Sequence, residues 1–275
     1  MAYESYTGVV AREVDTGEAD RYLTLLTVER GKLDCFAKGI RKQNSKLASQ
    51  SGLMTYGEYQ LFQKADRYIL TSARALESFH DIRADVVKCA YAAHILEITR
   101  DVVAEAQAFP EALQALLNSL HVLCYRDLAP EFVTRVFEIR ILSLAGFAPV
   151  LDRCTICGTP VQARDSLGAG FSVHGEGLVC GGPCRGQASG RVAPISRGAV
   201  RAMRYVAECG AGEIFGFSVS KAVSGELANI VPEYLQYQLG KEYKKPGEAE
   251  RYKAFERDMI KVMENGRAYG RRGGQ

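Results

Sequence analysis

The first 79 residues alternate between apolar and polar positions in short runs, a pattern typical of β-strands. Polar turns rich in Gly, Ser and Asp separate these runs. The predicted strands cover residues 3–10, 21–28, 33–38, 55–63 and 67–71, with loops at 13–20 and 39–52. Five short strands with one long polar connection predict a small closed barrel, for which the five-stranded OB fold is the candidate.

Beyond about residue 80 the apolar positions recur every three or four residues, which indicates amphipathic helices. The predicted helices cover residues 81–106, a segment that begins at Pro110, and residues 130–146, 197–209 and 221–240. Pro232 is expected to interrupt or kink the last helix. Short connections between long helices imply that neighbouring helices pack antiparallel.

These patterns predict an α+β chain with four parts. The parts are an N-terminal OB-fold domain that binds nucleic acid (1–79), an α-helical domain in two pieces (80–150 and 191–242), an inserted four-cysteine zinc module (151–190) and a charged C-terminal tail (243–275). We expect the tail to be a solvated helix that frays at its end.

The composition is that of an ordinary globular protein, with 47% hydrophobic and 24% charged residues in a chain of 275. No run approaches the roughly 18 apolar residues of a membrane helix, and the first residues do not resemble a secretory signal. We therefore expect a cytoplasmic protein that does not contact a membrane. A net charge of +3 does not by itself indicate a nucleic-acid partner, because only clustered cations do so.

Sequence motifs of enzymes are missing. The chain has no Trp and only four His, and it contains no GxxxxGK[ST] phosphate loop, no GxSxG turn and no HExxH helix. His80 and His94 are expected to be capping or core residues. We therefore predict that the protein is not an enzyme.

Four of the eight cysteines form two closely spaced pairs. Cys154 and Cys157 are followed by Gly158, and Cys180 and Cys184 enclose Gly-Gly-Pro. Tight turns present two thiolates together, and zinc takes four of them in a tetrahedron at about 2.3 Å. The spacing predicts one structural Zn²⁺ ion on these four cysteines, with no coordination position left for water. Two disulfides, or a degenerate site that no longer binds metal, are the alternatives.

A basic cluster lies in and before the long loop of the predicted barrel. Its cations are Lys32, Lys38, Arg41, Lys42 and Lys46, which fall within fifteen residues that contain one acid, Asp34. Such cations follow the phosphates of a single strand while aromatic rings stack on its bases. A solvated loop beside aromatic residues that fill the barrel is the alternative, and we expect most of those rings to be core.

Several longer segments carry more specific information. They are residues 17–32 (GEADRYLTLLTVERGK), 37–46 (AKGIRKQNSK), 76–79 (LESF) and 135–158 (RVFEIRILSLAGFAPVLDRCTICG). Together with the order of barrel, helices and cysteine pairs, these segments resemble the bacterial RecO family of recombination mediator and DNA repair proteins. The similarity covers about residues 5–240, and the last segment is the most specific.

The resemblance implies a nucleoid-associated protein without enzymatic activity that binds single- and double-stranded DNA and anneals complementary strands. It implies action with RecR and recognition of the C-terminal tail of single-strand-binding protein, which helps to load RecA. By motif, the implied DNA contacts are Lys38, Arg41, Lys42, Lys46, Arg21 and Lys32, and the implied zinc ligands are Cys154, Cys157, Cys180 and Cys184. The C-x3-C spacing of the second pair departs from the shorter spacing of many relatives.

Two other functions are compatible with the residues alone. A barrel and helices of mild net charge also suit a protein-interaction scaffold without intrinsic DNA binding. A zinc hydrolase would need an open coordination position and a general base, and the cysteine pattern offers neither.

Overall fold

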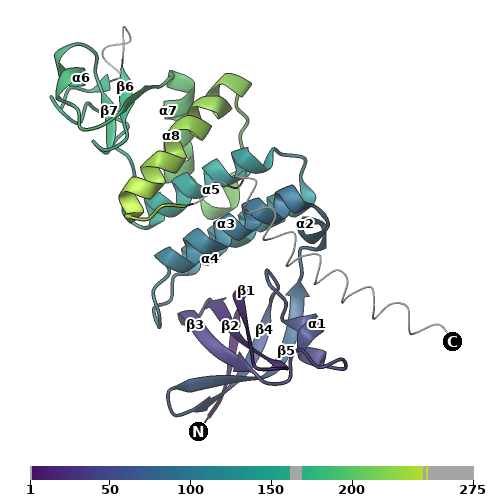
Figure 1. The fold of residues 1–275 in the computed structure, drawn as a ribbon. Helices are drawn as coiled ribbons and strands as arrows, with labels where there is room; N and C mark the ends of the chain where they lie inside the picture. The colour runs from purple at the N-terminus through teal and green to yellow at the C-terminus, as the bar shows by residue number, and fades with distance from the viewer. Residues whose placement is uncertain (1, 162–168, 244–245, 247–275) are drawn as a thin grey trace.

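The computed structural model describes residues 2–161, 169–243 and 246. Figure 1 shows three tiers, with a β-barrel at the bottom, a group of helices in the middle and a small sheet at the top. Within the described residues, no helix combines the length and apolar character needed to cross a membrane.

The barrel is built from β1 (Ala2–Thr16), β2 (Asp20–Thr27), β3 (Gly31–Ala37), β4 (Tyr56–Lys64) and β5 (Arg67–Glu77). The strand order β1-β2-β3-β5-β4 is closed because β1 pairs with both β2 and β4. A bulge between Val10 and Arg12 lies where β1 passes from one partner to the other. The parallel pairing of β3 with β5 completes the OB topology, so the predicted fold is confirmed.

Alternate side chains of the strands fill the barrel. This inner core contains Tyr6, Val10, Leu23, Leu25, Leu33, Cys35, Ala37, Ile40, Tyr59, Leu61 and Leu70. Val9, Leu26 and Met54 belong instead to the core of the helices. The barrel and the helices therefore share one continuous apolar contact.

The predicted loop at residues 13–20 is largely wrong. β1 continues to Thr16 and β2 begins at Asp20, so only three residues turn. The polar residues of this hairpin pair across the strands, since Arg21 forms ion pairs with Glu13 at 2.8 Å and Asp15 at 2.6 Å. The last predicted strand, 67–71, was too short, because β5 extends to Glu77. The predicted loop 39–52 contains a short helix, α1 (Lys46–Gln50).

Above the barrel lie α2 (His80–Ala84), α3 (Val86–Val102), α4 (Pro110–Tyr125), α5 (Pro130–Leu144), α7 (Arg197–Glu208), the 3-10 turn η2 (Ala211–Glu213) and α8 (Lys221–Leu239). α5 is the central helix and contacts α3, α4, α7 and α8. Residues 132–139 of α5 are all buried, which is expected of a helix surrounded by others.

Two helix predictions need correction. The predicted helix 81–106 is divided at Asp85, whose carboxylate caps α3 by accepting hydrogen bonds from the backbone N–H groups of Val87 and Lys88. Of the predicted interruption or kink at Pro232, the interruption is wrong, because α8 continues through this residue. The predicted tail helix lies outside the described residues, apart from Tyr243 and Pro246.

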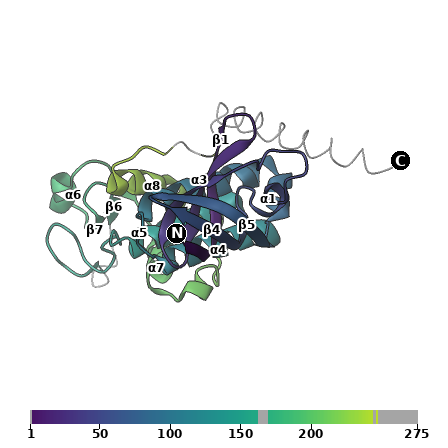
Figure 2. The ribbon, with the colours of Figure 1, turned by 90° about the horizontal axis from the view of Figure 1, so that it is seen from below.

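The insert is a three-stranded sheet with the order β7-β6-β8, made of β6 (Gly170–Ser172), β7 (Gly177–Val179) and β8 (Val192–Pro194), together with α6 (Pro183–Gln187). Seen from below in Figure 2, it projects to one side of the helices, away from the barrel. The inserted module of the predicted fold is therefore present, whereas the exact domain boundaries stay a prediction.

Candidate metal centre and nucleic-acid interface

Backbone hydrogen bonds bring the two cysteine pairs together. The N–H of Thr155 donates to the carbonyl of Leu178 on β7, and the N–H of Leu178 donates to the carbonyl of Val150. The segment before Cys154 therefore runs beside β7, and Cys180 follows directly after that strand.

Each pair sits on a tight turn. In the first, Gly158 has a φ of +71°, and its N–H donates to the carbonyl of Cys154. In the second, Gly182 has a φ of +66°, and Pro183 then begins α6, which carries Cys184. Glycine adopts positive φ without the cost that a Cβ brings. The C-x3-C spacing is thus accommodated by a turn at Gly182 followed by the start of α6.

The four sulfur atoms form a single cluster. All eight cysteines are free thiols, and the Sγ atoms of Cys154, Cys157, Cys180 and Cys184 lie within 4.8 Å of one another. Tetrahedral zinc with bonds of about 2.3 Å would separate its sulfur ligands by about 3.8 Å. The predicted ligands are therefore assembled as a possible metal site whose four sulfur donors fit zinc.

The pKa values of the clustered thiols also favour binding of a cation. The hydroxyl and backbone of Thr159 lower the pKa of Cys157 to about 6. Hydrogen bonding with Cys154 and Cys157 raises the pKa of Cys180 to about 12. One thiolate forms readily, whereas four crowded thiolates repel one another, and a divalent cation removes this repulsion.

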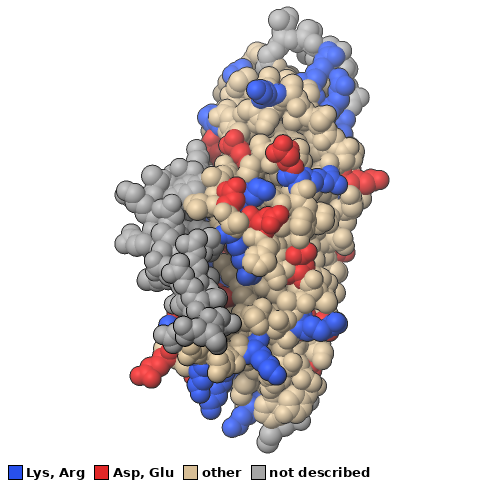
Figure 3. Space-filling model, turned by 90° about the vertical axis from the view of Figure 1, so that its right-hand side faces the viewer, with Lys and Arg blue, Asp and Glu red and all other residues tan. Residues whose placement is uncertain are grey.

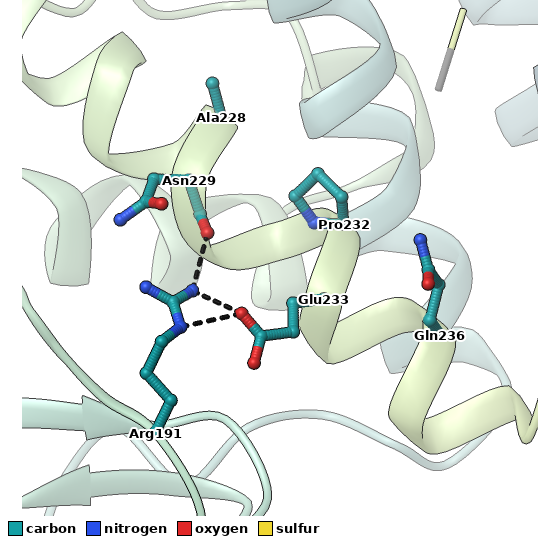
Figure 4. A pocket seen from close by; sticks show the side chains of 6 residues that line it. All are labelled: Arg191, Ala228, Asn229, Pro232, Glu233 and Gln236. Atoms are coloured by element: carbon teal, nitrogen blue, oxygen red, sulfur yellow. Dashed lines mark hydrogen bonds and ion pairs between the residues drawn. The ribbon is translucent and has the colours of Figure 1, made fainter. Parts of the chain in front are cut away.

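A polar contact fixes the insert on α8, beside a pocket drawn in Figure 4. Arg191 donates from Nε to the carboxylate of Glu233 at 2.7 Å and from Nη2 to the carbonyl of Asn229 at 2.9 Å. His174 stacks on Tyr237 with ring centroids 4.7 Å apart. His174 is thus part of the contact with α8 and does not belong to the sulfur cluster.

The cations of the basic loop lie at one end of the barrel. Lys38, Arg41 and Lys42 follow β3, and Lys46 is the first residue of α1; all four are exposed. Arg41 lies 3.4 Å from Asp15, whereas the other three form no ion pair among the described residues. Figure 3 shows Lys and Arg side chains at the lower, barrel end of one face of the molecule, and others at its upper end.

The two remaining predicted DNA contacts, Arg21 and Lys32, bind other groups of the protein. Arg21 is half-buried between two carboxylates. Lys32 is half-buried where the barrel meets the helices, and its Nζ donates to the carbonyl of Arg100 at 3.3 Å. The structure therefore brings Lys38, Arg41, Lys42 and Lys46 together and places Lys32 apart from them.

A buried charged cluster was missed by the sequence analysis. Glu138 on α5 accepts from Arg135 at 3.2 Å and lies 2.8 Å from Nε2 of His94, with all three side chains at most 5% exposed. His94 is a core residue, as expected. Arg135 and Glu138 are three residues apart on α5, but the contact with His94 on α3 joins two helices, so local spacing could not reveal the full cluster.

Two family models match the chain. The model described as recombination protein O N terminal matches residues 1–79, and the model described as recombination protein O C terminal matches residues 83–246. Together they cover the barrel, the helices and the insert.

Relatives show the same similarity along nearly their whole length. The chain is 39% identical over 245 residues to the DNA repair protein RecO of Acetivibrio thermocellus, which covers 89% of this chain and 95% of that protein. It is 31% identical over 236 residues to the DNA repair protein RecO of Dehalococcoides mccartyi, covering 86% and 90%. The chain with this barrel, helical core and four-cysteine insert belongs to the RecO family of DNA repair proteins.

Proposed function

We propose that the protein is a DNA-binding recombination mediator without enzymatic activity. It binds single- and double-stranded DNA, anneals complementary strands in the cytoplasm at the nucleoid, and acts with RecR and the tail of single-strand-binding protein to help load RecA. Membership of the RecO family supports the repair role.

The observation that carries the proposal is the set of exposed cations at the end of the OB barrel, of which Lys38, Lys42 and Lys46 form no ion pair among the described residues. Phosphates can approach these groups without first breaking a protein contact. Arg41 shares Asp15 with Arg21, so its charge is only partly available.

Annealing on such a surface needs no bond making. Cations reduce the repulsion between two phosphate backbones and raise their local concentration. Contacts to phosphate carry no sequence information, so any complementary pair of strands can form. The absence of a catalytic constellation in the sequence agrees with this passive mechanism.

We also propose that the metal is one structural Zn²⁺ ion, held by Cys154, Cys157, Cys180 and Cys184. Bound there, zinc cross-links the two turns and contributes on the order of 10 kcal/mol of apparent folding free energy. The four thiolates complete the tetrahedron, so the ion is a folding element of the insert.

Annealing of two complementary oligonucleotides, with and without single-strand-binding protein, tests the proposal. We expect the double variant Arg41→Glu/Lys42→Glu to anneal about tenfold more slowly, because two phosphate contacts are reversed. Lys221→Glu, an exposed lysine at the start of α8, is the matched control and should anneal like the wild type.

Equal rates for the double variant and the wild type would contradict the assignment of the basic loop. Failure of the wild-type protein to bind or anneal DNA would leave the protein-interaction scaffold as the function of the barrel and helices.

A further inference from the structure

The hairpin between β1 and β2 concentrates acids beside the basic loop. Residues 13–20, which we call the acidic hairpin, contain four carboxylates: Glu13, Asp15, Glu18 and Asp20. The basic loop, residues 38–46, contains four cations and no acid. Because β2 pairs with β3 from Arg21 and Ala37 onward, the turn of the hairpin and the start of the loop emerge at the same end of the barrel. The two segments therefore place opposite charges side by side.

Backbone hydrogen bonds fasten the acidic hairpin to the basic loop. The N–H of Arg41 donates to the carbonyl of Ala19 at 2.9 Å, and the N–H of Gly39 donates to the carboxylate of Asp20 at 2.6 Å. Both bonds reach the first residues of the loop, just after the end of β3. The hairpin is therefore a fixed neighbour of the loop, and side chains can exchange partners there without movement of the backbone.

Asp15 lies between two cations. One of its carboxylate oxygens accepts a hydrogen bond from Nε of Arg21 at 2.6 Å, and the other lies 3.4 Å from Nε of Arg41. Arg21 is held in turn by Glu13 at 2.8 Å, so it anchors Asp15 with one oxygen directed at Arg41. The side chain of Asp15 is 51% exposed and that of Arg41 is 37% exposed, so a ligand can reach both groups.

A carboxylate in this position opposes the binding of phosphate in two ways. It occupies Arg41 in the free protein, and an exposed ion pair of this kind changes an equilibrium constant by up to about fivefold. It also repels a phosphate that approaches Arg41, because like charges a few ångström apart destabilise each other.

The opposing effect would be positioning, in which the carboxylate orients Arg41 for its ligand. The contact between Asp15 and Arg41 is single and, at 3.4 Å, longer than an ordinary N–H···O hydrogen bond. It therefore fixes the guanidinium only loosely, and we expect competition and repulsion to outweigh positioning.

We propose that Asp15 sets the affinity of the basic loop for DNA by competing with phosphate for Arg41. The inference rests on the proposed function and adds an exchange step, in which a phosphate of the strand displaces the carboxylate. The lysines of the loop need no such exchange, because they form no ion pair among the described residues. A strand already bound to these lysines presents its next phosphate at high local concentration, so it displaces Asp15 more readily than an isolated phosphate does. The reverse exchange returns Arg41 to Asp15 and favours release of the annealed duplex.

Fluorescence anisotropy titrations of the full-length protein with a labelled oligothymidylate test this role. We expect Asp15→Asn to bind the strand about threefold more tightly than the wild type at low salt, because the amide keeps the shape of the side chain and removes its charge. The gain should shrink as salt rises, since screening weakens the competing carboxylate. Asp15→Glu restores the charge and should bind like the wild type.

Glu18→Gln is the matched control. It removes an exposed acid from the same hairpin, but Glu18 forms no ion pair among the residues that the structure describes. This variant should bind oligothymidylate like the wild type. Thermal melts of all variants check that the exposed substitutions leave the fold intact.

A double-mutant cycle shows whether Asp15 acts through Arg41. Arg41→Ala removes the group for which carboxylate and phosphate compete, so adding Asp15→Asn to this variant should raise its affinity by less than about 1.5-fold. A gain of the full size in the Arg41→Ala background would refute competition for Arg41.

The remaining outcomes separate this inference from the proposed function. If Asp15→Asn binds more weakly than the wild type, Asp15 positions Arg41 for DNA and the competition is refuted. If Asp15→Asn binds like the wild type, or gains no more than Glu18→Gln, the competition is also refuted. In each of these cases DNA binding by the basic loop stands. If neither the wild type nor Asp15→Asn binds the strand, both proposals are refuted.

Discussion

Cys154 is the most buried of the four clustered thiols, and its sulfur also lies 3.4 Å from the N–H of Cys180. We expect the wild type to carry one zinc ion per chain and Cys154→Ala to lose it, because three thiolates hold the metal much less tightly. The insert should then become sensitive to protease before the barrel does.

Cys209→Ala is the matched control, since Cys209 is a half-buried thiol outside the cluster. It should retain one zinc ion. Freshly purified, reduced wild-type protein without zinc in elemental analysis would contradict the proposed metal.

Glu138 neutralises Arg135 inside the helical core. Replacing the carboxylate in Glu138→Gln leaves the buried guanidinium without a counter-charge, so we expect the free energy of unfolding in urea to fall by about 3 kcal/mol. Glu58→Gln removes an exposed partner of Arg74 and should have little effect. Equal effects of the two substitutions would show that the buried cluster does not stabilise the helices.

At the scale of elements, Glu77 joins the barrel to the helices. Burial by itself raises the pKa of this carboxyl, but hydrogen bonds from the N–H of Phe79, the hydroxyl of Tyr125 and the N–H of Ser78 outweigh burial and lower it. Because the pKa of Glu77 is lower in the folded state, its ionised carboxylate stabilises the fold at pH values above the ordinary pKa of 4.5. This stabilisation is lost as the pH falls through the folded-state pKa.

We therefore expect the free energy of unfolding of Glu77→Gln in urea to be about 1 kcal/mol lower than that of the wild type at neutral pH. In acid we expect the two values to be equal. Glu18→Gln, at an exposed carboxylate in the β1–β2 turn, should match the wild type at both pH values. A deficit of Glu77→Gln that persists unchanged in acid would show that the ionised carboxylate is not the cause.

Local patterns predicted the elements well where one face is apolar. The strands β2, β3 and β4 and the helices α4, α5 and α7 were placed close to their observed bounds. The pattern failed where side chains face solvent or other polar groups: the hairpin at residues 13–20 looked like a loop because its polar residues pair across strands. The division at Asp85 depends on a cap within an otherwise continuous helical pattern.

For the molecule as a whole, the two candidate sites, the basic loop and the four-cysteine cluster, lie at opposite ends. Figure 1 places the barrel at one end, the insert at the other and the helices between them. The four-cysteine cluster was predictable because the spacing within each pair is local, and the basic loop because its cations lie close together in the chain. The pairing of distant strands, such as β3 with β5 at Phe36 and Ile69, was not predictable, since it arises only from the closure of the barrel.

The most direct test of whether the barrel binds DNA through its phosphates is an equilibrium binding experiment. It measures the affinity of the full-length protein for two single strands of unrelated sequence over a series of salt concentrations. We expect equal affinities for the two strands and a slope of log affinity against log salt of about −3, since each of roughly four phosphate contacts contributes about −0.7. Affinity that does not change with salt, or that depends strongly on which strand is used, would contradict the account.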